Sequence, residues 1–141
     1  MIESGVEKTK TTFVWRVKNF SARQEKKGQF IKSSSFTVIS TNGIATKWKL
    51  KLFPKGNTYA KNGNFSVFLQ IQETKARASY KILISNKNGK KMGTLVHSDG
   101  KVFKPEATWG VSIGPIDQLK EKWLFDDVLT LVCLMSVLET M

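Results

Sequence analysis

The sequence predicts an all-β protein, an antiparallel β-sandwich of seven to eight strands with one short helix. Three observations lead to this prediction. Several short segments alternate apolar and polar residues with a period of two, turn residues separate these segments, and only one segment has helical spacing. A chain of 141 residues, 40% hydrophobic and 24% charged, has the size and composition of a single domain with one core.

Three segments in the first half of the chain have strand character: residues 13–17, 30–39 and 46–53. In the first, Phe, Trp and Val occupy alternate positions, and the second is rich in residues that favour strands. The third has the clearest pattern, because a tryptophan and two leucines alternate with three lysines. Such alternation is typical of a half-buried strand with one side in solvent. Pro54 and Gly56 end it.

Three further strands are predicted at residues 65–72, 80–85 and 91–97. The first alternates regularly and places Phe68 on its otherwise polar side. Residues 86–90 contain Asn and Gly, which favour a hairpin turn between the next two strands. The pair Asp99–Gly100 predicts another turn.

The last third of the chain combines a short strand at 109–113, the helical segment at 115–123 and a final strand at 128–138. Proline suits the start of a helix, and apolar residues follow Pro115 at spacings of three and four. The final segment is almost continuously apolar, so we expect a central strand buried on both faces. The predicted core comprises Trp15, Trp48, Leu50, Leu52, Leu69, Ile82, Leu129 and Leu131.

Residues 1–11 are polar and aperiodic, which predicts a flexible leader before a domain at residues 12–141. No window is apolar enough for a membrane helix, and the first residues lack the apolar run of a secretory signal. A single cysteine, Cys133, and a single histidine, His97, exclude a disulfide framework and a zinc site. We therefore expect an intracellular domain of the nucleus or cytoplasm, without metal or cofactor.

The same residues argue against an enzyme. His97 would need a nucleophile and an orienting carboxylate, and Asp99 shares its strand face too closely to build a triad. Cys133 lies in an apolar strand and is expected to pack in the core. Asp126 and Asp127 precede the last strand and are expected to bind backbone amides. No phosphate-binding glycine loop is present.

The charge balance is unusual, because 23 basic residues oppose 11 acidic ones and the net charge is +12. Such a charge attracts polyanions, so a nucleic-acid-binding or polyanion-binding domain is one alternative. Only three of the basic residues are arginines, Arg16, Arg23 and Arg77, and the lysines are spread along the chain. Both features weaken the nucleic-acid interpretation.

Binding to an extended peptide is the other alternative that the residues support. Phe68, Tyr80 and Trp109 are aromatic residues that core packing alone need not explain, and Gly110 follows Trp109 directly. Strand edges offer amide hydrogen bonds, aromatic rings form pockets for alternate side chains, and a glycine would let a peptide backbone approach.

Six segments, in order and spread over residues 10 to 138, resemble the MATH domain (meprin and TRAF-C homology). They are Phe13–Ser21, Ile31–Phe36, Trp48–Gly56, Asn88–Gly89, Trp109–Gly110 and Asp126–Cys133. The similarity is greatest to the MATH domains of speckle-type POZ proteins, in which a BTB domain follows. It implies an eight-stranded antiparallel sandwich that recognises short Ser/Thr-rich substrate peptides for a cullin-3 ubiquitin ligase.

The resemblance also implies a set of peptide contacts. The aromatic positions of the family match Phe68, Tyr80 and Trp109, with Gly110 beside the tryptophan. Two other aromatic positions of the family are Lys101 and Val111 here, and the Lys-Asp pair before the tryptophan is Ala107–Thr108. We therefore expect a peptide site that includes Phe68, Tyr80, Lys101, Thr108, Trp109, Gly110 and Val111, with altered specificity.

The resulting hypothesis is a monomeric, non-enzymatic peptide-binding domain that reaches cullin-3 indirectly, through a BTB domain outside this chain. Two alternatives stay open: the polyanion-binding domain, and an oligomerising scaffold as in the TRAF branch of the family.

Overall fold

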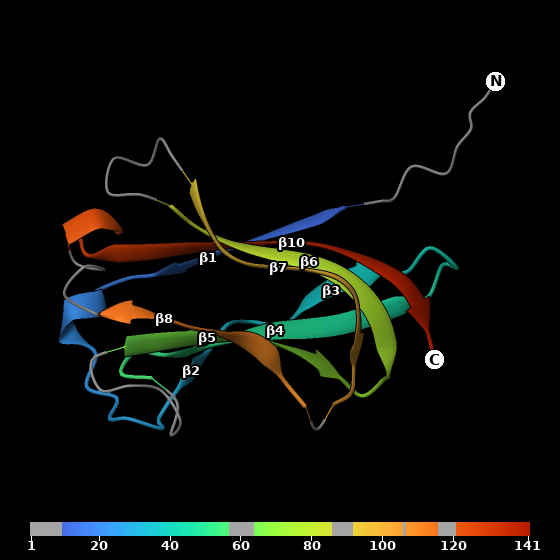
Figure 1. Ribbon diagram of the computed structural model, residues 1–141, viewed down its shortest axis with the longest axis horizontal. Helices are drawn as coiled ribbons and strands as arrows, with labels where there is room; N and C mark the ends of the chain where they lie inside the picture. Colours follow the sequence, from blue (N-terminus) through green and yellow to red (C-terminus); the bar gives the residue numbers. More distant parts are fainter. Residues whose placement is uncertain (1–9, 57–63, 86–91, 106, 116–120) are drawn as a thin grey trace.

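The computed structural model describes residues 10–56, 64–85, 92–105, 107–115 and 121–141 (Figure 1). This part of the chain contains ten strands and a single 3-10 turn, η1 (Phe20–Ala22). The strands are β1 (Thr11–Val17), β2 (Ile31–Lys32), β3 (Phe36–Ile39), β4 (Ala45–Phe53), β5 (Asn64–Gln72), β6 (Ala76–Ser85), β7 (Met92–Phe103), β8 (Trp109–Pro115), β9 (Leu124–Phe125) and β10 (Val128–Thr140).

The strands form two antiparallel sheets that lie face to face (Figure 1). Sheet A has the order β1-β10-β6-β7, and β9 pairs with β10. Sheet B has the order β2-β4-β5-β8, and β3 pairs with β4 beside β2. The predicted all-β antiparallel sandwich is confirmed. Two of the ten strands, β2 and β9, are only two residues long, so eight longer strands build the fold.

Strong period-two patterns gave accurate strand positions. The predicted strands at 46–53 and 65–72 correspond to β4 and β5, and the last apolar segment corresponds to β10 in the middle of sheet A. The segment 30–39 is split into β2 and β3 by serines, of which Ser33 is buried and bonds the backbone of Leu50. Thr11, the last residue of the predicted leader, is the first residue of β1. Residues 1–9 of the predicted leader lie outside the described part.

The predicted turn at Asp99–Gly100 is wrong, because β7 continues through both residues to Phe103. The backbone of Gly100 has a φ of 62°, and its N–H donates to the Ser79 hydroxyl at 3.0 Å. The register with β6 shifts at this point, so the glycine forms a β-bulge within the strand.

The predicted helix at 115–123 starts too early, since Pro115 ends β8. Most of this segment, like the predicted hairpin turn at 86–90, lies outside the described residues. Glu121 and Lys122 near its end are helical.

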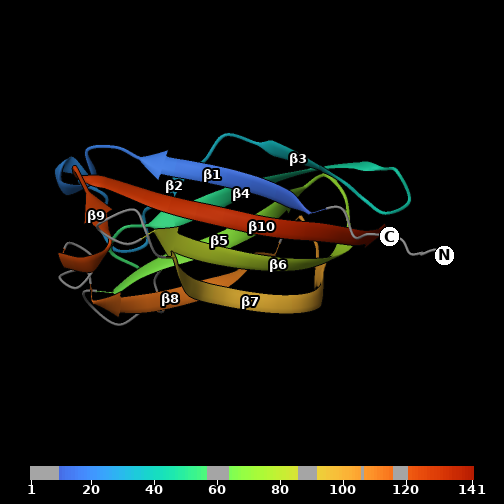
Figure 2. The same cartoon turned by 90° about the horizontal axis from the view of Figure 1, so that it is seen from above.

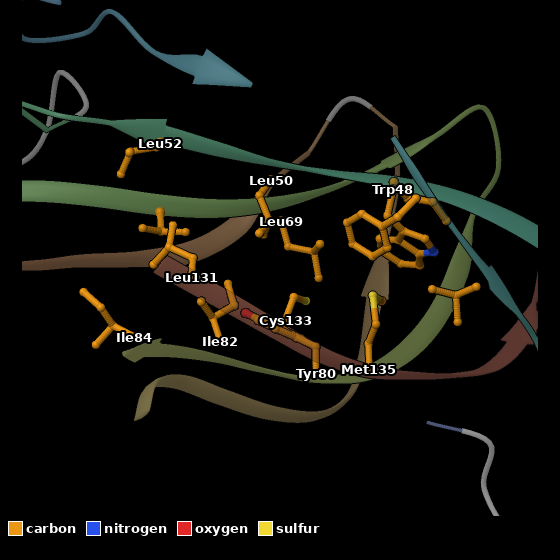
Figure 3. Packing of buried hydrophobic residues seen from close by; sticks show 14 of the residues in the cluster. Trp48, Leu50, Leu52, Leu69, Tyr80, Ile82, Ile84, Leu131, Cys133 and Met135 are labelled. Carbon is orange, nitrogen blue, oxygen red and sulfur yellow. The ribbon is translucent and has the colours of Figure 1, made fainter. Parts of the chain in front are cut away.

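The core lies between the sheets, where the inward side chains of β4 and β5 meet those of β6 and β10 (Figure 3). Seven of the eight predicted core residues are buried. The exception is Trp15 on the edge strand β1, which is half-buried and packs against the core. The ring of Trp48 is fully buried and meets Phe103 edge-on, with ring centroids 4.9 Å apart.

The two long sides of the sandwich are closed differently (Figure 2). On one side, the turn after β3 reaches β10, and the Thr41 N–H donates to the Val137 carbonyl at 3.0 Å. The Thr41 hydroxyl also donates to the Leu138 carbonyl. On the other side, β7 ends sheet A and β8 ends sheet B, and these two edge strands contact each other. The candidate site residues gather around this second side.

Candidate functional site

Trp109 is the first residue of β8, and its ring is fixed against β7. Its indole N–H donates to the Val102 carbonyl at 2.9 Å, and the ammonium of Lys101 lies 4.0 Å from the ring centroid. A cation at this distance is attracted to the ring by its quadrupole. The ring nevertheless remains 38% exposed. Lys101 and Trp109 therefore form a pre-positioned surface at the edge where the two sheets meet.

Phe68 and Gly110 lie directly opposite each other on β5 and β8, on the outer face of sheet B. A Cβ at Gly110 would lie 2.0 Å from the Val67 carbonyl oxygen and 2.6 Å from the Cα of Phe68. From the sequence we expect this glycine to leave room for a ligand backbone. That expectation is wrong, because atoms of β5 already fill the space that a Cβ of residue 110 would occupy. Any side chain there would displace β5, so a substitution of Gly110 tests folding rather than binding.

The ring of Phe68 also has packing partners within the domain. It meets Phe53 edge-on at 5.6 Å, and Phe53 in turn lies 5.2 Å from Phe30 between ring centroids. Phe68 is half-buried in this aromatic row, whereas Phe30 is 40% exposed. The sequence alone could have placed Phe53 on the solvent side of its strand. Phe53 follows Lys51 at a spacing of two, so the two side chains share one face of the strand.

Tyr80 does not lie with these residues. It is only 3% exposed and lies in the core (Figure 3). Its ring packs edge-on against Phe103, with ring centroids 5.5 Å apart. Burial raises its pKa, and the neighbouring Cys133 acts in the same direction. In this structure Tyr80 is a core residue and presents no ring to a surface ligand, contrary to the expectation from sequence.

The two remaining candidate residues flank Trp109. Thr108 is half-buried and precedes β8 directly. The backbone of Val111 pairs with Val67 on β5, and its side chain lies outside the described part of the structure. The structure thus brings Lys101, Thr108 and Trp109 together at the β7–β8 side, places Phe68 and Gly110 on the adjoining outer face of sheet B, and separates Tyr80 from both groups.

The residues considered for catalysis occupy ordinary structural positions. The side chain of His97 is 55% exposed, and its Nε2 lies 3.4 Å from an Asp99 oxygen that is itself well exposed. Both residues line an open depression of about 290 Å³ on sheet A, away from Trp109. Cys133 is fully buried, and burial raises the pKa of its thiol to about 12. Within the described ranges, no cluster of three or more His, Cys, Asp or Glu side chains could hold a metal.

Asp127 has the predicted structural role at the turn before the last strand. Its carboxylate accepts hydrogen bonds from the Ser21 N–H at 2.9 Å and from the Ser21 hydroxyl at 2.6 Å. Its carbonyl accepts the Phe20 N–H at 2.9 Å. These bonds join the turn after β1 to the β9–β10 hairpin.

Among the described residues, no helix is long and apolar enough to cross a bilayer.

The fold and this site together define a class of proteins: two-sheet antiparallel sandwiches with an exposed aromatic residue between neighbouring sheet edges. The MATH domain family model matches residues 12–135, and the chain belongs to this family. MATH domains typically mediate protein–protein interactions and generally lack catalytic activity. Among solved structures, Notothenia coriiceps TRAF5 is similar, with a TM-score of 0.56 and 13% identity over 89% of this chain and 72% of that chain. At this identity the similarity shows the fold alone.

Proposed function

We propose that this domain binds short, extended Ser/Thr-rich peptides along the β7–β8 side of the sandwich. The observation that carries the proposal is the position of Trp109, exposed yet fixed by Lys101 and the Val102 carbonyl. A ring that is already ordered loses little conformational freedom when a ligand covers it, so more of its burial contributes to affinity.

The neighbouring edges supply the other requirement for peptide binding. Among the strands that the structure describes, β7 and β8 each have one side without a strand partner. An extended peptide can use such backbone groups, while its alternate side chains contact Trp109 and the half-buried ring of Phe68. The small contact area predicts modest affinity.

Lys101 sets the expected specificity. Its ammonium lies above the Trp109 ring, where a phosphate or carboxylate of the peptide could pair with it. An apolar side chain in the same place would have to desolvate the ammonium, which is unfavourable. We therefore expect an acidic or phosphorylated residue in the peptide at this position. Val111 is smaller than the aromatic residue at the matching family position, so we expect a wider and shallower pocket beside it.

The second part of the proposal concerns biological context. We propose that the domain is the substrate-recognition part of a MATH-BTB adaptor in the nucleus or cytoplasm, and that a BTB domain outside these residues binds cullin-3. The sequence resemblance to speckle-type POZ proteins supports this role.

Titration calorimetry of the domain with Ser/Thr-rich peptides that carry an acidic, phosphorylated or apolar residue tests the peptide site. Trp109→Ala should abolish measurable binding, because it removes the exposed ring. Lys101→Tyr should shift the preference from acidic toward apolar peptides. The matched control is Phe125→Ala, which removes another exposed aromatic side chain, 56% exposed on β9. If Trp109→Ala binds as well as wild type, the site lies elsewhere.

Co-precipitation of cullin-3 with the full-length protein tests the adaptor role separately. Peptide binding without cullin-3 association would leave the peptide site intact and overturn the adaptor assignment.

A further inference from the structure

The five strands of sheet B contain no aspartate or glutamate. They contain four lysines, Lys32 on β2 and Lys47, Lys49 and Lys51 on β4. The acidic residues of the described strands, Asp99 and Glu139, both belong to sheet A. The strands of sheet A carry four basic residues beside these two acidic ones, so sheet B differs in having its four positive charges without any acidic residue among its strands.

All four lysines point away from the core. On β4 they alternate with buried Trp48, Leu50 and Leu52, and Lys32 is the direct cross-strand neighbour of Lys51. None of the four forms an ion pair with any residue that the structure describes. We call these four side chains the lysine face.

The lysines are close enough to repel one another. Partial burial, and then the charges of Lys32 and Lys49, hold the pKa of Lys51 below its usual value. Lys51 also lies 4.7 Å from the centroid of the Phe30 ring, which shields one side of its ammonium from water. A partner that brings negative charge to this face would relieve the repulsion.

The spacing of the face matches an extended chain. Alternate residues of a strand repeat at roughly 6.8 Å, so Lys47, Lys49 and Lys51 form a straight row with that repeat. An extended segment of another protein presents alternate side chains with the same repeat. We propose that the lysine face binds an extended acidic segment of a partner protein with Asp or Glu at alternate positions, at a surface separate from Trp109.

Two features favour an acidic protein segment over a single-stranded nucleic acid. The strands of sheet B contain lysine but no arginine, whereas planar arginine is the side chain suited to phosphate and base contacts. The rings of Phe53 and Phe68 pack against each other, and Phe30 packs against Phe53 and Lys51. Phe30 is 40% exposed, but one partly exposed ring offers less stacking than the successive aromatic rings typical of a single-strand binding groove.

Fluorescence anisotropy with a labelled (Glu-Gly)6 peptide, which contains no Ser or Thr, tests the proposal. The test variant carries Lys47→Gln, Lys49→Gln and Lys51→Gln. The control variant loses the same charge from exposed turn positions through Lys26→Gln, Lys55→Gln and Lys75→Gln. We expect the dissociation constant to rise about tenfold in the test variant, as for the loss of three exposed charge contacts, and less than threefold in the control variant. Circular dichroism confirms that both variants fold.

Three further arms complete the experiment. A peptide of the same composition with its six glutamates in one block should bind more weakly, because its charges do not match the row. The test variant should bind the phosphorylated Ser/Thr-rich peptide of the proposed peptide site as tightly as wild type, which separates the lysine face from that site. Equal losses in the two triple variants, equal binding of the alternating and the block peptide, loss of Ser/Thr-rich peptide binding in the test variant, or binding of an oligothymidine alone would each overturn the proposal.

Discussion

Cys133 is chemically isolated by its position between the sheets. Its side chain is fully buried, and burial raises the pKa of the thiol from 9.0 to about 12. At neutral pH the thiolate, which is the reactive form, is thus about a thousand times scarcer than in an exposed cysteine. Because the folded pKa is raised, the thiol favours folding below pH 9, and this contribution is lost as the pH rises from 9 toward 12.

We predict that Cys133 reacts with a thiol reagent at pH 8 only as fast as the protein unfolds. The measurement is the rate of thiol labelling, followed by absorbance in buffer and in denaturant. The control is Thr37→Cys in a Cys133→Ala background, which places a thiol on the exposed side of β3. Labelling of native Cys133 at the rate of this control would contradict its burial.

Tyr80 and Phe53 show what sequence could reveal about single residues. Tyr80 shares its strand face with Ile82 and Ile84, which are both buried, so the period of two already places it in the core. Its match to an aromatic position of the family carried no information about exposure. The contact between Lys101 and Trp109 could not be predicted, because it depends on two edge strands of different sheets coming together.

At the scale of elements, the β9–β10 hairpin depends on two consecutive aspartates with positive φ, 51° at Asp126 and 58° at Asp127. This backbone conformation matches the two-residue turn that best follows the twist of paired strands, and aspartate tolerates it better than most residues. Within the described part of the chain, the carboxylate of Asp127 accepts hydrogen bonds from Ser21 and that of Asp126 does not, so comparing the two residues separates backbone strain from hydrogen bonding.

We predict that Asp127→Ala lowers the free energy of unfolding by roughly 1–3 kcal/mol more than Asp126→Ala. Both variants place alanine in a left-handed conformation, but only the first removes the acceptor for two Ser21 donors. Urea denaturation of both proteins measures the difference. Equal losses of stability would mean that the Ser21 bonds contribute nothing to the hairpin.

The strands whose positions were predicted well are those with large apolar residues at every second position, such as β4 and β5. The first part of β6, Ala76–Ser79, contains only small residues and arginine, so its sequence gives no alternation to detect. In β7, Asp99–Gly100 resembles a turn because a bulge and a turn both favour residues that tolerate positive φ. Local sequence could not decide between them.

At the scale of the whole molecule, the net charge of +12 opposes compaction, and the strands of sheet B contribute four lysines with no acidic residue beside them. Raising the salt concentration from about 0.01 to 0.15 M shortens the screening length from roughly 30 to 8 Å. We predict that the midpoint of thermal unfolding rises by roughly 3 °C over this range, which corresponds to about 1 kcal/mol in a domain of this size.

Calorimetric scans at matched pH measure this change. The variant with Lys47→Gln, Lys49→Gln and Lys51→Gln should show a smaller rise, because it lacks three charges of the lysine face. An equal rise in this variant and in wild type would place the repulsion elsewhere, and a fall in both would contradict it.

The class of fold followed from sequence because patterning and turns suffice to distinguish a sandwich from alternating β and α elements. The strand order did not follow, since pairings such as β10 with both β1 and β6 join residues far apart in the chain. The lysine face was partly visible as alternation in β4, but the addition of Lys32 to it required the pairing of β2 with β4.

The different closure of the two long sides has a consequence for the motions of the domain. Thr41 holds the β3–β10 side through one backbone hydrogen bond and one hydroxyl hydrogen bond, whereas side-chain contacts of Trp109 close the β7–β8 side. Among the described residues, separation of the sheets breaks a backbone–backbone hydrogen bond at the Thr41 side but only side-chain contacts at the Trp109 side, so we expect local opening to start at the Trp109 side. Amide protons of β7 and β8 then exchange with solvent sooner than those of β10, and a ligand seated on Trp109 slows this exchange by holding the two sheets together.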